Sequence, residues 1–103
     1  MARQPVVLGY ETLTVAASAL ALTGGVTAAK SFVGKLETAQ IRARGDGTNP
    51  TSSEGVIIDI GDIVYLSETE IAKTKFVRTG STSGVLKGHF YNVEVDVLLG
   101  AGV

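Results

Sequence analysis

Alternating apolar and polar residues mark the central part of the chain, between residues 37 and 61. In its first half every second position is apolar and the positions between are polar or basic: Ala39, Ile41 and Ala43 against Thr38, Gln40, Arg42 and Arg44. This period of two predicts a half-buried strand with a charged outer face over residues 37–44. A polar run over 45–55 interrupts the pattern. Val56, Ile58 and Ile60 then resume it before Gly61-Asp62 turns the chain into residues 63–66.

The segments on either side of this stretch are also predicted to be mostly strands. Residues 6–15 and 75–78 are strand candidates, and the Gly/Ser/Thr turn 80–84 predicts a hairpin onto residues 85–97, where alternation is clearest from Tyr91 to Val97. Residues 16–22 are ambiguous between an extended segment and one helical turn, because alanine and leucine favour helix while the flanking threonines and Gly24-Gly25 favour short strands and a turn.

One short helix is expected between two of these strands. Ser67 and Glu70 form the S-x-x-E pattern of a capping box immediately before the apolar Ile71 and Ala72. The pattern predicts a single helical turn over residues 68–73, which is too short to be stable without packing.

These elements together predict an all-β fold: a compact antiparallel β-sandwich with at most one or two short helical turns. A chain of 103 residues is expected to form a single domain, 1–103, with a short N-terminal arm, 1–7, and an apolar C-terminal tail, 98–103. Alanine and valine supply much of the apolar content and there is no tryptophan, so the core is expected to be thin.

Composition excludes several classes of partner. Nine basic and ten acidic residues give a net charge of -1, which does not suit nucleic acid or an anionic membrane surface. The weakly polar run 13–26 is too short and mild for a membrane span, which needs about 20 apolar residues. The N-terminus lacks the pattern of a signal peptide, and a protein made in a cytoplasm is expected. The absence of cysteine excludes disulfides and thiolate chemistry.

No motif for catalysis stands out, and the chain is not expected to be an enzyme or to hold a cofactor. His89 is the only histidine and has no accompanying nucleophile motif, so it is interpreted as structural; by parity it shares a face with Tyr91 and Val93. The carboxylates are scattered. The glycines fit turns rather than phosphate-binding or dinucleotide-binding loops.

The turn 45–55 offers possible oxygen ligands in Asp46, Asn49 and Glu54. Their spacing does not match the helix-loop-helix calcium motif, which needs alternating ligands, a central glycine and a glutamate at position twelve. A plain turn stabilised by Asx and Ser/Thr side-chain hydrogen bonds is the preferred interpretation, so no metal site is predicted.

Basic residues recur on the predicted strands: Arg42, Arg44, Lys75, Arg78 and Lys87. They could line one sheet face as a docking surface for an acidic partner. The preferred alternative is an ordinary solvated face balanced by Glu37, Glu70 and Glu94. Because Glu37 has the parity of the core positions, it is expected to lie at the edge of the core or to need a partner, and Arg78 is one candidate.

The three tyrosines, Tyr10, Tyr65 and Tyr91, allow two interpretations. Aromatic rings stack on the faces of sugars, so the tyrosines could form a sugar-binding platform. Since they are few and far apart in sequence, a role as core or interface filler is preferred.

Several of these motifs together resemble small virion proteins of tailed bacteriophages, a loose group of β-sandwich proteins. The resemblance covers roughly residues 10–92 and is carried by a strand ending in I-R-x-R, a D-G-T-x-P-T turn, a G-D corner and a late K-F-V-R strand: Ile41 to Arg44, Asp46 to Thr51, Gly61-Asp62 and Lys75 to Gly80, closing with Ser83 to Leu86. Residues 93–103 and the alanine-rich stretch 16–29 depart from the pattern.

The resemblance implies a structural role in the virion. Its members serve in capsid decoration (cement) or as tail and head-fibre parts. The expected function is a decoration protein, made in the host bacterial cytoplasm, that binds the outer surface of a phage head and stabilises contacts between major capsid protein subunits. The alternative is a carbohydrate-binding or adaptor module of a tail or head fibre.

A decoration protein is expected to contact the major capsid protein and copies of itself, in a trimer or another cluster. An N-terminal arm, an apolar C-terminal tail and a thin core are expected in a subunit that contacts with neighbouring subunits stabilise. The expected contacts lie in the arm, the long turn and the tail: Arg3, Gln4, Pro5 and Val6; Asp46, Thr48, Asn49 and Pro50; Val97, Leu98 and Leu99.

Overall fold

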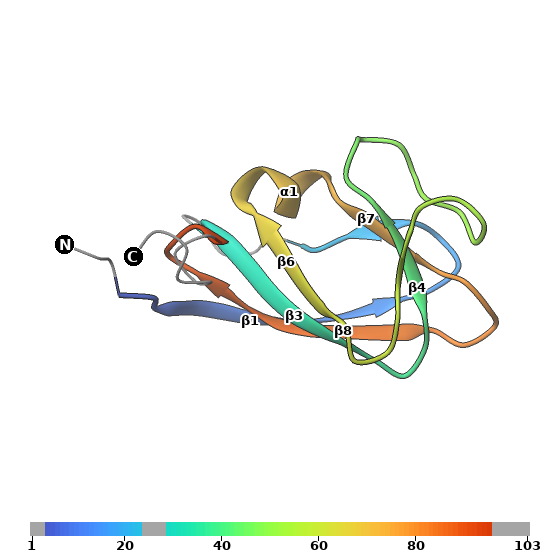
Figure 1. The fold of residues 1–103 in the computed structure, drawn as a ribbon, viewed down its shortest axis with the longest axis horizontal. Coiled ribbons are helices and arrows are strands. Elements are labelled where there is room, and N and C mark those ends of the chain that lie inside the picture. The colour runs from blue at the N-terminus through green and yellow to red at the C-terminus, as the bar shows by residue number, and fades with distance from the viewer. Residues whose placement is uncertain (1–3, 24–28, 96–103) are drawn as a thin grey trace.

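A computed structural model of the chain describes residues 4–23 and 29–95. Within these ranges the elements are β1 (Val7–Val15), β2 (Leu20–Ala21), β3 (Ser31–Glu37), β4 (Ile41–Arg44), β5 (Val56–Ile58), β6 (Ile63–Ser67), α1 (Glu68–Lys73), β7 (Lys75–Arg78) and β8 (Gly84–Tyr91). Strands dominate, and α1, the one helix with both ends inside the described ranges, joins β6 to β7 (Figure 1). The prediction of an all-β fold with at most one or two helical turns is confirmed.

The strands form two antiparallel sheets of four. The first sheet has the order β1-β8-β3-β6 and the second has the order β2-β7-β4-β5. The chain passes from one sheet to the other at almost every connection, and β4 and β5 are the two consecutive strands that pair directly within the described part. Figure 1 shows the resulting elongated body, with the described N-terminal residues at one end of its long axis.

The core lies between the two sheets and is built from few large side chains. Phe32, Phe76 and Phe90 are its largest fully buried residues, and the rings of Phe32 and Phe90 lie 5.1 Å apart on paired positions of β3 and β8. Leucines and isoleucines fill most of the remaining space, and valines and alanines supply less of it than the composition predicts. Alternation places Phe32, Gly34 and Leu36 of β3 inward and leaves Val33 and Lys35 on the outer face.

The strand predicted over residues 37–44 is two elements, and this prediction was wrong. β3 ends at Glu37, a tight turn follows, and β4 begins at Ile41 in the other sheet. The turn is closed by a hydrogen bond from the Ala39 N–H to the Glu37 carbonyl (3.0 Å), with Thr38 at a φ of 81°. A β-branched residue rarely adopts positive φ, so the sequence carries no usual turn signal at this corner.

The last strand is shorter than predicted. β8 ends at Tyr91, and residues 92–94 continue without strand pairing, although the alternation of residues continues beyond them. Val93 is nevertheless fully buried, and its carbonyl accepts a hydrogen bond from the hydroxyl of the buried Ser31 (2.7 Å). The backbone therefore stays against the core here without joining the sheet.

Other local predictions are confirmed. β1, β7 and the turn at Gly61, whose φ is 91°, lie where the sequence places them, and residues 16–22 are largely extended, with the short strand β2. The capping box of α1 is present in both directions: the Ser67 side chain accepts from the Glu70 N–H, and the Glu70 side chain accepts from the Ser67 N–H. The predicted turn at Gly24-Gly25 falls outside the described residues.

Candidate interaction surfaces

Hydrogen bonds between Val6 and Asn92 hold the inner end of the N-terminal arm against the first sheet. The Val6 N–H donates to Oδ1 of Asn92 (2.8 Å), and the Asn92 N–H donates to the Val6 carbonyl (3.2 Å). Val7 already belongs to β1 and pairs with Tyr91. The predicted arm 1–7 is therefore too long at its inner end. Gln4 and Pro5 are exposed, and Arg3 lies outside the described residues.

The predicted tail contacts Val97, Leu98 and Leu99 also lie outside the described residues. The remaining predicted contacts, in the turn 45–55, lie toward the end of the long axis opposite the described N-terminal residues (Figure 1). The arm and the turn thus do not form one continuous surface.

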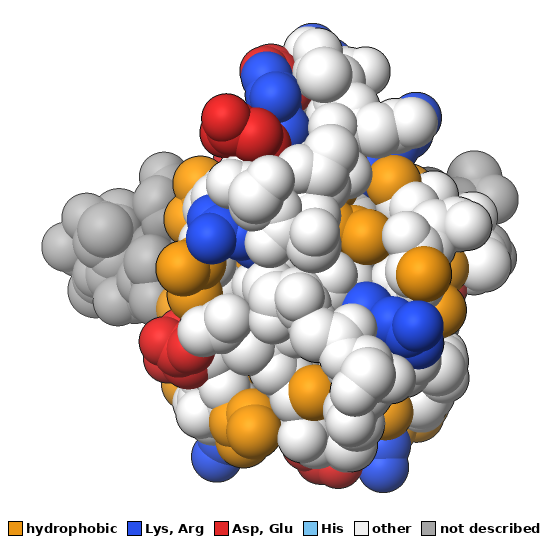
Figure 2. All heavy atoms as spheres, turned by 90° about the vertical axis from the view of Figure 1, so that its right-hand side faces the viewer, with side chains coloured by type: hydrophobic (Ala, Val, Ile, Leu, Met, Phe, Trp, Pro, Cys, Tyr) orange, Lys and Arg blue, Asp and Glu red, His pale blue; other side chains and the backbone are white. Residues whose placement is uncertain are grey.

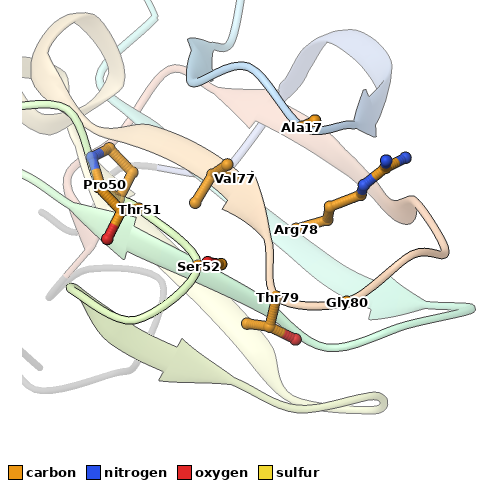
Figure 3. Close-up of a pocket in the computed structure, with 8 residues that line it drawn as sticks. All are labelled: Ala17, Pro50, Thr51, Ser52, Val77, Arg78, Thr79 and Gly80. Carbon is orange, nitrogen blue, oxygen red and sulfur yellow. The ribbon is translucent and has the colours of Figure 1, made fainter.

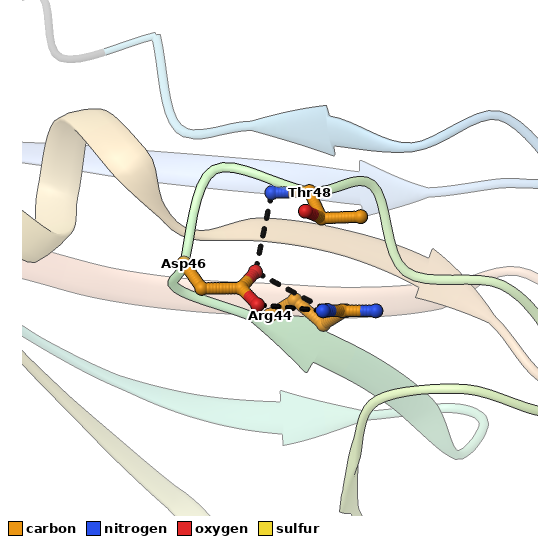
Figure 4. A network of polar contacts seen from close by, with 3 residues as sticks. All are labelled: Arg44, Asp46 and Thr48. Carbon is orange, nitrogen blue, oxygen red and sulfur yellow. Dashed lines mark hydrogen bonds and ion pairs between the residues drawn. The ribbon is translucent and has the colours of Figure 1, made fainter.

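Asp46 organises the first part of this turn (Figure 4). Its carboxylate accepts two hydrogen bonds from the Arg44 guanidinium (2.6 and 3.2 Å) and one from the Thr48 N–H (3.1 Å). The hydrogen bond from Arg44 is the main reason that the pKa of Asp46 falls from its ordinary value of 3.8 to about 2, and the Thr48 N–H lowers it further. The same contact raises the pKa of Arg44.

Asn49, Pro50 and Thr51 hold the rest of the turn against the second sheet. Asn49 Oδ1 accepts from Lys75 Nζ (3.0 Å), Pro50 is buried, and Thr51 Oγ1 accepts from the Ser53 and Glu54 N–H groups. The bonds of Thr51, together with that from the Thr48 N–H to Asp46, are the Ser/Thr and Asx bonds of the preferred interpretation. Among residues 4–23 and 29–95, no group of three possible metal ligands comes together.

The five basic residues do not line one face, so both interpretations that placed them on a single face, the docking surface and the preferred solvated face, were wrong. Arg42, Arg44 and Lys75 project from the outer face of the second sheet, where the turn covers them; Arg42 donates to the carbonyls of Ser52 (3.1 Å) and Gly55 (2.8 Å). Lys87 lies on the first sheet. Under the turn, Arg42 donates its hydrogen bonds to loop carbonyls, and Arg44 donates to the Asp46 carboxylate.

The expected pair between Glu37 and Arg78 is also absent. Glu37 lies 3.6 Å from Lys87 Nζ, and Arg78 donates to the Ser83 hydroxyl (3.3 Å).

A hollow of about 470 Å³ lies between the turn at Pro50 to Ser52 and the residues Val77 and Thr79. Figure 3 shows the Arg78 guanidinium pointing away from the turn residues. The hollow is thus lined by hydroxyls and apolar groups without a converging charge.

The outer face of the first sheet carries all three tyrosines together with the histidine. Tyr10 pairs with His89 across β1 and β8, His89 pairs with Val33, and Val33 pairs with Tyr65, so these residues form one row across four strands. The His89 ring lies 5.5 Å from the Tyr10 ring and 6.2 Å from the Tyr91 ring. His89 and Tyr91 share this face as predicted, whereas Val93, predicted on the same face, is fully buried because the strand ends at Tyr91. Tyr10 and Tyr65 are exposed, so they do not fill the core.

The segment 56–65 exposes five large apolar side chains within ten positions. They are Val56, Ile57, Ile60, Ile63 and Tyr65, with exposed fractions between 40% and 71%. β5 and β6 are the outermost strands of the two sheets on this side of the sandwich, and the turn after Ile58 links them. We call this set the apolar edge. The opposite strand of the first sheet adds a smaller exposed apolar group at its start, Val6 to Leu8.

The end of the molecule that carries the loops differs from the apolar edge in the types of side chain at its surface (Figure 2). Its hydrophobic side chains are separated by polar side chains and backbone, and basic and acidic groups are scattered among them. No helix among the described residues is long and apolar enough to cross a membrane.

Sequence reasoning missed the apolar edge as a surface because it treated Val56, Ile58 and Ile60 as buried positions of a strand. The signal was present in the short length of the strand, which leaves its residues at the rim of the sheet.

Comparisons of this chain with protein-family models, with curated proteins and with solved structures return no match.

Proposed function

We propose that the protein is a structural virion protein: a cement or decoration protein that binds the outer surface of a phage head and stabilises contacts between major capsid protein subunits. Two observations support the proposal. The sequence motifs resemble small phage virion proteins, and the β-sandwich that such proteins share is the fold of this chain.

The apolar edge is the observation that carries the proposal. Exposed apolar side chains that are concentrated in one segment favour a contact surface, because a partner that covers them removes apolar area from water. Each Val, Ile or Leu side chain that passes from full exposure to full burial contributes roughly 1.5–3 kcal/mol. With Val56 at 71% and Ile60 at 61% exposure, most of that gain is available to a partner.

The edge also offers backbone groups. β5 pairs on one side with β4, and its other side is the rim of the second sheet. Strands at a rim are commonly protected by lysine, proline or a bulge. β5 reads Val-Ile-Ile and carries none of these; its protection is limited to its length of three residues. Strand addition by a capsid subunit or by another copy of this chain would bury both the apolar side chains and the unpaired backbone.

The mechanism in this proposal is mechanical. Many copies, each bound through a modest apolar contact, bridge neighbouring capsid subunits, and their number supplies avidity. A cluster of copies, such as a trimer, fits the same surface. No bound cofactor or reaction is needed.

Fractionation of virus particles tests the proposal. Particles from cells that encode the chain are separated into heads, tails and free protein on a density gradient, and the chain is located by mass spectrometry. We expect it in the head fraction, in a fixed ratio to the major capsid protein. Recovery only as a free monomer, or only with tails, would overturn the proposed head location.

A further inference from the structure

We propose that the outer face of the first sheet binds an acidic saccharide, a glycan unit that carries a carboxylate, between the aromatic cluster of Tyr10, His89 and Tyr91 and the neighbouring lysines Lys35 and Lys87. We call this surface the saccharide groove. It lies on the outer face of the first sheet and shares Ile63 with the apolar edge. Its aromatic rings and lysines are not part of that edge, so the inference goes beyond the proposed assembly role.

Tyr10 leaves more than half of its surface exposed to solvent on this sheet face. Its hydroxyl accepts a hydrogen bond from Thr12 Oγ1 (3.2 Å), two residues along the same strand, so the ring runs along β1. Tyr10 is 57% exposed, and the His89 ring supports its side at 5.5 Å with a tilt of 58°. The apolar C–H face of a sugar packs on such a ring, while its hydroxyls stay in water.

Two paired lysines make this sheet face favourable for a negatively charged ligand. Lys35 and Lys87 stand directly opposite each other on β3 and β8, one row along from His89 and Val33. Like charges at directly opposed positions of a sheet destabilise it, since their Cβ atoms are only about 4.5–5.5 Å apart. Glu37 lies 3.6 Å from Lys87 Nζ and offsets part of this repulsion. For Lys35, no ion pair is found within the part of the chain that is described.

An anionic group placed between the two ammonium groups would relieve the remaining repulsion. The face therefore favours a carboxylated ligand over a neutral one of the same shape. The carboxylate would lie one strand row from the aromatic cluster. That distance, of the order of 7 Å along a strand, is comparable to the width of one sugar ring.

The groove between these groups is shallow. Its volume is about 270 Å³, and the backbone of Gly34 and Gly88, which lack side chains, lies along it together with Val33 and Ile63. Pockets that enclose small molecules usually span roughly 300–1,000 Å³. The groove thus suits one unit of a longer saccharide chain that lies on the surface, with weak affinity per site.

Binding measurements with three carboxylated oligosaccharides test the inference: a galacturonate trimer, a hyaluronan tetrasaccharide and sialyllactose. Titration is followed by calorimetry and by amide chemical shifts. The matched ligand control is the fully methyl-esterified galacturonate trimer, which keeps the shape and loses the charge. We expect at least one acidic oligosaccharide to bind, and the esterified trimer to bind at least tenfold more weakly than the galacturonate trimer if that is the one bound.

Variants then locate the site. Tyr10→Ala and Lys35→Gln should each weaken binding at least tenfold, whereas Lys73→Gln on the exposed side of α1 and Ile60→Asp on the apolar edge should leave it unchanged. Circular dichroism checks that each variant is folded. Lack of binding to all three oligosaccharides would overturn the inference. So would equal weakening by Lys73→Gln, or binding of a poly-glutamate peptide as tight as that of the best saccharide, which would indicate an acidic protein partner.

Discussion

Gly88 lies directly opposite Gly34 across β8 and β3, and the ring of Phe32 occupies the space that a side chain at either position would need. A Cβ atom on Gly88 would lie 2.6 Å from Cζ of Phe32 and 2.6 Å from Cα of Gly34. The Phe32 ring thus packs directly against the backbone of Gly34 and Gly88, because neither glycine has a side chain. This close approach is the reason that a chain poor in large side chains can fill the space between its sheets.

Gly88→Ala should therefore destabilise the fold by about 3 kcal/mol, near the upper end of the usual cost of overpacking. Urea unfolding followed by circular dichroism measures the change. Gly80→Ala is the matched control, because a Cβ there meets nothing within 4 Å, and it should stay within about 0.5 kcal/mol of the original chain. Equal stability of the two variants would contradict this account of the core.

The capping box of α1 gives a second prediction. Ser67→Ala removes the acceptor of the Glu70 N–H and should cost about 1 kcal/mol of unfolding free energy, because a helix of one and a half turns depends on its cap. Thr69→Ala, at an exposed position of the same turn, is the control and should have a smaller effect. Thermal unfolding of the two variants provides the comparison, and a larger loss from Thr69→Ala would count against the cap.

The ion pair in the long turn predicts a pH dependence. The pKa of Asp46 is lowered by folding, so its contribution to stability is fully present above the ordinary value of 3.8 and is lost as the pH falls through about 2. Asp46→Asn should be less stable than the original chain at pH 7, and the two should converge between pH 4 and pH 2. Urea midpoints across this range test it; a difference that persists unchanged at pH 2 would contradict the assignment.

The fastening of the N-terminal segment can be tested at Asn92. Asn92→Ala removes the side-chain acceptor of the Val6 N–H, and a hydrogen bond of this kind contributes about 1 kcal/mol. Amide exchange at Val6 should accelerate about fivefold. Asn92→Asp keeps an acceptor oxygen at the same place and should restore slow exchange. If both variants exchange like the original chain, Val6 is held by other contacts.

Features with local causes could be predicted from the sequence. The capping box, the Gly61 turn and the Asx and Ser/Thr bonds of the turn 45–55 each depend on residues within a few positions of one another. β1 and β7 followed from their apolar and polar patterns. The all-β class followed from the sum of these signals.

Features that depend on pairing between distant segments could not be predicted. The alternation from Glu37 to Arg44 continues through the corner at Thr38, so it conceals the passage between sheets. Tyr10 meets His89 only through the register of β1 with β8, 79 positions apart in the chain. Parity did identify the common face of His89 and Tyr91, because both lie on one strand.

The apolar edge is the central claim of the proposed function, and occupancy of phage heads tests it most directly. Ile60→Asp places a charge in the middle of the edge, at a turn position where 61% exposure lets the fold tolerate it. Thr82→Asp adds the same charge to the exposed β7–β8 turn at the loop-bearing end and is the control. Copies per head, counted by mass spectrometry of purified particles, should fall at least tenfold for Ile60→Asp and stay unchanged for Thr82→Asp. Equal occupancy by both variants would contradict the account.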